Sequence, residues 1–378
     1  MSGNSHRTVL EGIVLALLLA ASPVLAIAET VPDRSAGLGE RSDRNLFGPL
    51  RIRDMTPFNL LRLDMLPAHA VEAEPHSFAI EADVSVANTF AMSSNVRRYL
   101  QQRGERTSLT AADAEAILGL GQDAFYMDGE FGLLELRFHY RVLSRTSVSL
   151  GVSAYDFSGG FMDGSIEGFH DGFGLRADGR DLVARRQFQT VMSLDGAGYA
   201  ALETPVEQGM GDPVLGVRHS VPLGGSRWTL VMSGEAKIAW QGERPFLSTG
   251  TNDYGVQLAL QRKFSRQAVY CNASLVSTDG QVFGIDLERR VIPTFTAAYE
   301  VEMTAFTNLI GQVYASQSTI QDTSMEVITA DKYQVSVGVR SRRGGLIYGI
   351  AFTENVKNFD NTPDVGLTLT LAWADLMP

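Results

Sequence analysis

The chain has 378 residues, of which 44% are hydrophobic and 20% are charged, and its formal net charge is −11. This acidic balance argues against nucleic acid as a partner, because nucleic-acid binding depends on basic surfaces. The only cysteine, Cys271, cannot form an internal disulfide, so a small secreted scaffold held together by disulfides is excluded.

Residues 1–28 have the pattern of a secretory signal peptide. His6 and Arg7 precede an apolar run over residues 13–25, and residues 26–28 read Ala-Ile-Ala, a small-residue cleavage pattern. The alternative is an uncleaved membrane anchor, but the run is shorter than the roughly 20 apolar residues that a spanning helix needs. We therefore expect an exported protein that is cleaved after Ala28.

Two regions are expected after the signal peptide. Residues 29–77 are predicted to form an N-terminal periplasmic extension or plug, and residues 78–378 a β-barrel. No stretch after the signal peptide is apolar enough for a membrane helix. Only helices and closed barrels satisfy every backbone hydrogen bond in lipid, so a membrane location without such a helix requires a closed barrel.

From residue 80 onward the sequence alternates between apolar and polar residues, which predicts strands with two chemically different faces. In residues 130–142, leucines and aromatic residues share one face, whereas Glu135 and Arg137 share the other. The same alternation recurs over residues 80–90, 147–154, 228–240, 254–264, 269–277, 291–301, 309–317, 333–340 and 365–373.

Strand length and turn spacing favour a membrane barrel over a soluble sandwich. The strands run to about ten residues or more, the length that a tilted strand needs to cross a bilayer, whereas strands of soluble proteins average about five or six. Short turns alternate with long connections, as in outer-membrane barrels. Helical signals are scarce, and the best covers residues 110–118, where Thr110 can cap the helix. The predicted short turns lie at residues 143–146, 224–227, 265–267 and 341–344.

These patterns predict an all-β fold, a transmembrane antiparallel up-and-down β-barrel with long outer loops. If every short turn faces the periplasm, the chain must alternate sides from the first strand to the last. Strands at residues 186–193 and 199–204 keep that alternation intact and give fourteen strands, an even number as bacterial barrels require. Twelve strands is the next count that we consider.

The polar residues of these strands are predicted to line the lumen, because charge on the lipid face is costly. Two interpretations stay open: the charges pair with one another and fill a polar interior, or they line a water-filled path and tune its selectivity. The predicted lumen residues are Glu81, Asp83, Glu135, Arg137, His139, Arg141, Arg218, Glu235 and Lys237, followed by Gln257, Gln261, Lys263, Asn272, Glu300, Asn308, Gln312, Lys332 and Arg340.

The long connection over residues 156–185 is the most distinctive segment and contains GGFMDGSIEGFHDGFGL at residues 159–175. Here the chain resembles an uncharacterised family of exported Gram-negative β proteins described only as a domain of unknown function. The resemblance also covers GPLRIRD at residues 48–54, GMGDPVLG at residues 209–216 and the closing stretch over residues 352–364. It implies an outer-membrane barrel of unknown activity and supplies no catalytic residues.

We expect this long connection to fold into the barrel and constrict it. Its glycines are suited to turns, and its phenylalanines would form an unfavourable apolar patch if they were exposed. The alternative is a metal or catalytic site formed by its carboxylates and imidazole, but their spacing matches no known calcium or zinc site. The predicted constriction residues are Phe161, Asp163, Glu167, Phe169, His170 and Asp171.

The sequence provides no convincing catalytic site, metal site or cofactor site. His219 and Ser220 are adjacent on a predicted strand, so they point to opposite faces and cannot act as base and nucleophile. We therefore expect a non-enzymatic passive channel or uptake porin for small molecules in the outer membrane, with membrane lipid and the barrel assembly machinery as partners. A carboxylate-based hydrolase, a structural barrel without transport and a periplasmic ligand-binding β protein are the alternatives.

Overall fold

The computed structural model describes residues 46–71, 74–120, 123–173, 179–194, 197–202, 208–224, 227–286, 290–321, 323, 325–357 and 365–374. The predicted signal peptide and residues 29–45 lie outside these described residues. Within the described ranges, no helix has the length and hydropathy that crossing a membrane requires.

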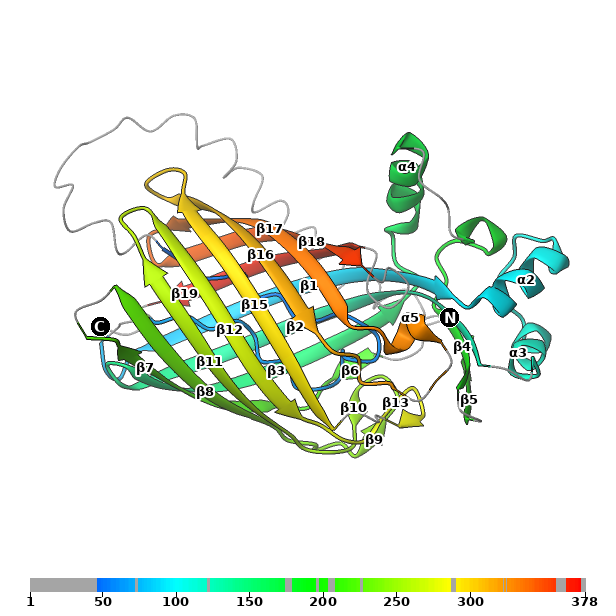
Figure 1. Ribbon diagram of the computed structural model, residues 1–378, viewed down its shortest axis with the longest axis horizontal. Coiled ribbons are helices and arrows are strands. Elements are labelled where there is room, and N and C mark those ends of the chain that lie inside the picture. Colours follow the sequence, from blue (N-terminus) through cyan, green and yellow to red (C-terminus); the bar gives the residue numbers. More distant parts are fainter. Residues whose placement is uncertain are drawn as a thin grey trace, which may run out of the picture.

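Twelve antiparallel strands form a closed ring (Figure 1). The ring closes because β1 pairs with β2 on one side and with the last strand, β19, on the other. In order around the ring, the strands are β1 (Phe78–Met92), β2 (Ala124–Leu143), β3 (Thr146–Ser158), β7 (Val214–Pro222), β8 (Trp228–Lys237), β11 (Asp253–Lys263), β12 (Gln267–Ser277), β15 (Val291–Glu302), β16 (Thr307–Ser316), β17 (Lys332–Arg343), β18 (Leu346–Lys357) and β19 (Val365–Ala374).

The ring therefore has twelve strands and not the preferred count of fourteen. The two additional strands that the sequence predicts are present as β4 (Gln189–Leu194) and β5 (Ala197–Ala201), but they lie outside the ring. The hairpin pairs with the first residues of β2, beyond the point where β2 stops pairing with β3. Strands of this hairpin show the same alternation of apolar and polar residues as strands of the ring. The alternation alone therefore could not show that the hairpin lies outside the ring.

The two ends of the barrel differ. Short turns join β2 to β3, β7 to β8, β11 to β12, β15 to β16 and β17 to β18 at one end, on the left in Figure 1. The long connections at the other end carry α2 (Ser94–Arg103), α3 (Ala111–Leu118), α4 (Asp163–Phe173), the 3-10 helix η2 (Arg180–Leu182), α5 (Glu326–Thr329), β6 (Gln208–Met210), β9 (Glu243–Arg244), β10 (Ser248–Thr249), β13 (Gln281–Val282) and β14 (Ile285–Asp286). The predicted cap of α3 is confirmed, since Thr110 Oγ1 accepts a hydrogen bond from Asp113 N.

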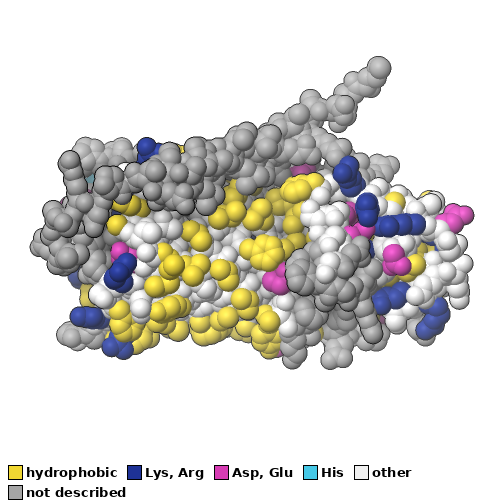
Figure 2. All heavy atoms as spheres, turned by 90° about the horizontal axis from the view of Figure 1, so that it is seen from above, with side chains coloured by type: hydrophobic (Ala, Val, Ile, Leu, Met, Phe, Trp, Pro, Cys, Tyr) yellow, Lys and Arg dark blue, Asp and Glu magenta, His cyan; other side chains and the backbone are white. Residues whose placement is uncertain are grey.

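The outer wall of the barrel is apolar. On β11, Val256 is 62% exposed and Leu258 is 58% exposed, whereas the intervening Gln257 is buried. Hydrophobic side chains cover the part of the wall that is visible in Figure 2, and the arginine and lysine side chains gather mainly toward its two ends. An apolar belt of this extent is far larger than the patches that soluble monomers expose, so it requires a lipid environment.

Residues 46–71 fill the interior, and we call them the inner segment. They begin near the short-turn end, where Leu46 packs with Ala268 and Tyr270. The segment turns at the far end, where the backbone amides of Asn59 and Leu60 both donate to Thr56 O at 2.9 Å. It then runs back, so both of its ends lie toward the short turns (Figure 1, blue). We call residues 46–55 the ascending limb and residues 61–71 the returning limb.

Candidate functional site

Two arginines of the inner segment form ion pairs with carboxylates on the barrel wall. Arg51 Nε lies 3.0 Å from Glu81 Oε2 on β1, and Arg53 Nη1 lies 3.2 Å from Glu135 Oε2 on β2. All four residues belong to the buried interior or its margin. A buried charge requires a partner, so these pairs fix the position of the ascending limb against β1 and β2.

The wall carboxylates at this level are close neighbours. Asp83 on β1 is directly opposite Glu135 on β2 in the strand register. Arg137 bridges Glu135 and Glu235 at 3.0 and 2.7 Å, and Glu81 contacts His139 Nε2 at 3.1 Å. Like charges that face each other across two strands repel, so this arrangement depends on the cations placed between them.

Asp54, the residue after Arg53, contacts the part of the wall formed by β16 and β17. Asp54 is fully buried and accepts hydrogen bonds from Asn59 Nδ2 at 2.7 Å and from Tyr314 Oη at 3.2 Å. Its carboxylate also lies 3.6 Å from Arg62 and 4.0 Å from Lys332 Nζ on β17. Arg53 and Asp54 are consecutive residues that reach different walls, so the inner segment bridges the lumen at this level.

Near the short-turn end, the backbone of the inner segment is held by Glu300. This carboxylate is fully buried and accepts hydrogen bonds from Phe47 N at 2.7 Å and from Gly48 N at 3.1 Å. Tyr270 Oη and Asn308 Nδ2 also donate to it, each at 2.6 Å. The carboxylate thus joins two wall strands to the point where the inner segment begins.

We expect Glu300→Gln to loosen this contact and to speed amide hydrogen exchange at Phe47 and Gly48. The amide keeps the shape of the carboxylate but loses its charge, and hydrogen bonds to charged groups contribute about 1.5–3 kcal/mol each. Hydrogen exchange of the purified protein, followed by mass spectrometry, would detect the change. Glu302→Gln, at the end of the same strand, is the matched control and should behave as the unmodified protein; faster exchange in both variants or in neither would contradict this role of Glu300.

The returning limb is held by polar side chains that reach its backbone from the wall. The contacts are Lys237 Nζ to Leu61 O at 3.0 Å, Leu63 N to Asp253 Oδ2 at 2.7 Å, Gln257 Nε2 to Met65 O at 3.0 Å, Ala68 N to Asn272 Oδ1 at 2.8 Å, and Ala70 N to Gln261 Oε1 at 2.8 Å. The wall therefore satisfies the backbone groups of a segment that has no strand partner of its own.

The far end of the interior is an aromatic cluster into which the tip of the inner segment inserts. The Phe58 ring lies 6.1 Å from that of Phe125 and 6.0 Å from that of Phe283, measured between centroids. Around them pack side chains from the long connections and the projecting strands, including Phe157, Phe188 and Phe246. No local sequence pattern indicates this cluster, because its aromatic members come from widely separated parts of the chain.

The structure places most of the predicted lumen residues on the inner wall. Buried there are Asp83, Glu135, Arg137, Lys237, Gln257, Gln261, Asn272, Glu300, Asn308, Gln312, Lys332 and Arg340. Glu81, His139, Arg218, Glu235 and Lys263 are half-buried on the inward side of their strands. Arg141 lies at the short-turn end, where its guanidinium donates to the Val71 carbonyl.

The expectation that residues 156–185 enter the barrel and constrict it is wrong. Helix α4 stands beyond the end of the barrel in Figure 1 and carries Phe169, His170 and Asp171. Phe161 is 51% exposed, and the interior is already occupied by the inner segment. The glycines at 164, 168 and 172 led us to expect a loop, because glycine disfavours helix interiors.

Asp163 and Glu167 of this connection make contacts at the outer end of the barrel. Asp163 is buried, pairs with Arg180 at 3.2 Å and accepts a hydrogen bond from Asn88 of β1. Glu167 pairs with Arg106 and Arg185, and the hydrogen bond from Arg185 holds the pKa of the Glu167 carboxyl below its ordinary value. These residues join the outer connections to one another.

Among the residues that the structure describes, neither a metal centre nor a His219–Ser220 catalytic pair is found. In the described ranges, no group of three or more histidine, cysteine, aspartate or glutamate residues could hold a metal ion. His219 is exposed and Ser220 is buried, so the two point to opposite faces of β7.

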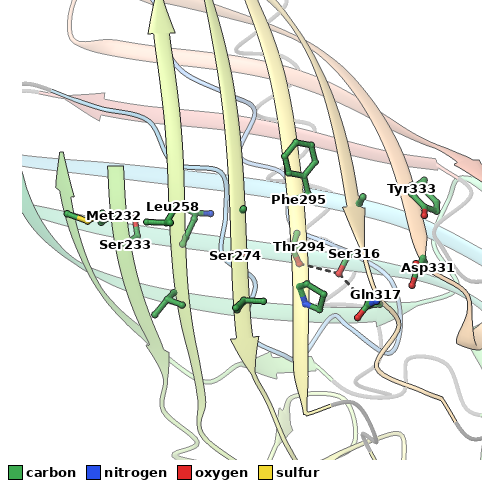
Figure 3. Close-up of a pocket in the computed structure, with 16 residues that line it drawn as sticks. Met232, Ser233, Leu258, Ser274, Thr294, Phe295, Ser316, Gln317, Asp331 and Tyr333 are labelled. Atoms are coloured by element: carbon green, nitrogen blue, oxygen red, sulfur yellow. Dashed lines mark hydrogen bonds between the residues drawn. The ribbon is translucent and has the colours of Figure 1, made fainter. Parts of the chain in front are cut away.

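A depression of about 760 Å³ lies in the wall across β8, β11, β12, β15, β16 and β17. Figure 3 shows its lining side chains, which come from successive strands. Leu258, Leu275 and Phe295 are exposed apolar residues of its outer side, whereas Thr294 and Ser316 are buried and bonded to each other at 3.2 Å. The exposed apolar residues therefore place the opening of the depression on the apolar exterior of the wall.

The closed antiparallel ring, with its apolar outer face and polar interior, defines a transmembrane β-barrel. Residues 40–374 match the model of the family described as "Protein of unknown function (DUF3187)", and the chain belongs to that family. The resemblance to a family of unknown function is thereby confirmed. No curated protein matches the chain.

The solved structures to which the chain is similar include an outer membrane channel and two toluene transporters. The COG4313 outer membrane channel from Pseudomonas putida F1 is 10% identical, with 82% of this chain and 100% of that chain covered and a TM-score of 0.50. The Ralstonia pickettii toluene transporter TbuX is 11% identical, with 85% and 98% covered and a TM-score of 0.38. The P. putida toluene transporter TodX is 10% identical, with 80% and 90% covered and a TM-score of 0.39. At these identities the likeness concerns the fold.

Proposed function

We propose that the protein is an outer-membrane channel for small solutes and that the inner segment closes it at rest. The observation that carries the proposal is the way the interior is filled. Polar groups of the wall bind the backbone and side chains of a single chain segment, which can be removed without breaking the ring. The wall left behind would be a polar passage.

The path of the inner segment makes its removal physically simple. Both of its ends lie toward the short turns, so it can leave on that side without being threaded through the barrel. A barrel with only a structural role has no need of an interior filled in this way, because wall side chains alone fill the interior of small barrels. The contacts at Glu81, Glu135, Glu300 and Lys332 then hold the channel closed in the absence of a signal.

The apolar belt supports the outer membrane as the location and argues against a soluble periplasmic protein. Short turns face the periplasm in outer-membrane barrels, which would place the inner segment's ends on the periplasmic side. The export signal predicted at residues 1–28 and insertion by the barrel assembly machinery agree with that location. No catalytic arrangement has been found in the described residues, so a channel accounts for the interior better than an enzyme does.

Deletion of residues 46–66 is expected to convert a silent barrel into a steadily conducting one. The deletion removes the ascending limb, the turn and most of the returning limb, and it leaves every ring strand intact. Purified proteins would be compared in planar bilayers, and altered gel mobility on heating would confirm that each barrel is folded. The control replaces residues 164–173 of α4 with a short Gly-Ser linker, and it should stay silent because α4 lies outside the barrel.

Two outcomes of the deletion experiment would contradict the proposal. A folded deletion variant that conducts no current would favour a structural barrel without transport. Equal conductance of the unmodified protein and the deletion variant would show that the inner segment does not close the channel.

A further inference from the structure

We propose that the opened channel selects cations at one part of its inner wall and that solutes with a guanidinium or primary ammonium group bind there. This part of the wall, which we call the acidic wall, consists of Glu81, Asp83, Glu135 and Glu235 on β1, β2 and β8. The inference rests on the proposed function, because the acidic wall becomes accessible only when the inner segment leaves.

The first argument is that the acidic wall is already occupied by cationic groups from a removable segment. Arg51 and Arg53 reach Glu81 and Glu135 at 3.0 and 3.2 Å. The planar guanidinium group matches the geometry of a carboxylate, and its weak hydration favours it in partly buried sites. Each arginine therefore stands where the cationic end of a solute would stand after the inner segment has left.

The second argument is that the wall alone places one guanidinium group in ion pairs with these carboxylates, whereas Arg218 and Arg340 interact with them only at longer range. Arg137 is the wall arginine that pairs with the group, and it is shared between Glu135 and Glu235. Within the described residues, neither Arg218 nor Arg340 lies within 4.0 Å of an acidic-wall carboxylate in an ion pair. Loss of the inner segment thus removes two of the three guanidinium groups that pair with the acidic wall.

The third argument is that acceptor capacity is unused even in the closed state. Glu235 Oε2 is buried and has no hydrogen-bond partner in the described residues. Asp83 is 7% exposed, receives a hydrogen bond from the Thr370 hydroxyl and forms no ion pair in the same part of the chain. Both groups face the region that the inner segment would vacate, and a multidentate cation is the ligand that satisfies such oxygens.

The first test measures ion selectivity in the variant that lacks residues 46–66. Under a KCl gradient, its reversal potential is expected to have the sign of a cation-selective pore. Adding Glu81→Gln and Glu135→Gln should lower the ratio of cation to anion permeability severalfold. The matched control carries Glu105→Gln and Glu115→Gln, two exposed residues of the outer connections, and should retain the selectivity.

The outcomes separate this inference from the proposed function. A deletion variant that conducts without preferring cations overturns the acidic wall as a selective site and leaves the channel function standing. Selectivity that survives Glu81→Gln and Glu135→Gln in a folded barrel overturns it too. A folded deletion variant that conducts nothing overturns the proposed function, and the inference falls with it.

The second test uses the full chain and asks whether a free guanidinium ion replaces the missing side chains. Arg51→Ala with Arg53→Ala is expected to increase the current, because the ascending limb loses both ion pairs. Millimolar guanidinium chloride should lower that current again, whereas the same concentration of sodium chloride should not. The block should disappear when Glu81→Gln and Glu135→Gln are added; a block that persists, or a failure of guanidinium to block, would contradict binding at the acidic wall.

Discussion

Asp54→Asn in the inner segment is expected to raise the open probability of the channel strongly. Asp54 is fully buried with Arg62 and Lys332, and the asparagine leaves both cations in the interior without their shared carboxylate. Removing one partner of a buried ion pair costs about 3–5 kcal/mol. Because the cost falls on the closed state, the open probability should rise roughly a hundredfold or more, at about 1.4 kcal/mol for each factor of ten.

Single-channel open probability measures this effect directly. Adding Lys332→Met to Asp54→Asn should restore part of the closure, because one of the two cations that lost the Asp54 carboxylate is then gone and the other keeps Asp64 nearby. Asp181→Asn in the outer connections is the control with the same chemical change. The role of Asp54 in closure would be contradicted if Asp54→Asn stayed as silent as this control.

Phe58→Ala is expected to have an effect of similar size at the opposite end of the inner segment. Phe58 is 1% exposed between the rings of Phe125 and Phe283, and truncating a buried phenylalanine to alanine costs about 3–5 kcal/mol. In the withdrawn state this side chain has left the aromatic cluster, so its loss destabilises the closed state. The current should therefore increase strongly, whereas Phe161→Ala, at an exposed position, should leave it unchanged.

A ligand provides a second measurement for Phe58. Empty apolar cavities in proteins bind benzene, so benzene should partly restore closure in Phe58→Ala by filling the vacated space. It should not restore closure in Asp54→Asn, where the missing group is a charge. Restoration in both variants would mean that benzene acts elsewhere on the channel.

The strands and their orientation could be predicted because a two-residue period follows directly from strand geometry. Glu135 and Arg137 illustrate this, since their alternation with leucine and phenylalanine already assigns them to the polar face. The number of strands in the ring could not be derived in the same way. Whether β4 and β5 enter the ring depends on how far β1 and β2 project, and no local pattern encodes that length.

The path of the inner segment could not be predicted either, because its partners lie on strands that are distant in sequence. The Glu300 carboxylate, for example, is separated from Phe47 by 253 positions. The motif at residues 48–54 contains one indication that this segment is buried against a polar wall, because Leu50 and Ile52 alternate with Arg51 and Arg53. In the structure the aliphatic side chains pack against the wall and the arginines pair with carboxylates.

The first residue of that motif, Gly48, lies where the two limbs of the inner segment approach each other. Its φ is +92°, and an added Cβ would lie 2.4 Å from His69 Nδ1 on the returning limb. The two limbs of the inner segment can approach each other here only because residue 48 lacks a side chain. The need for glycine at this position depends on the contact with His69, which the sequence does not indicate.

The most direct test of the closure mechanism is a reversible disulfide between the inner segment and the wall. A Cβ at Gly255 would lie 2.9 Å from Met65 Cγ, where the sulfur of a cysteine at position 65 would stand. That spacing suits an S–S bond of about 2.05 Å. Met65→Cys and Gly255→Cys would be combined with Asp54→Asn, to favour opening, and with Cys271→Ser, to remove the native thiol.

The current of this combined variant would be recorded before and after a reductant is added to the same bilayer. If withdrawal of the inner segment opens the channel, the oxidised protein is silent and the reductant starts a steady current. The same protein without Met65→Cys should conduct throughout, which controls for effects of the reductant. An oxidised protein whose cross-link is verified and which conducts as well as the reduced one would contradict the claim that the inner segment closes the channel.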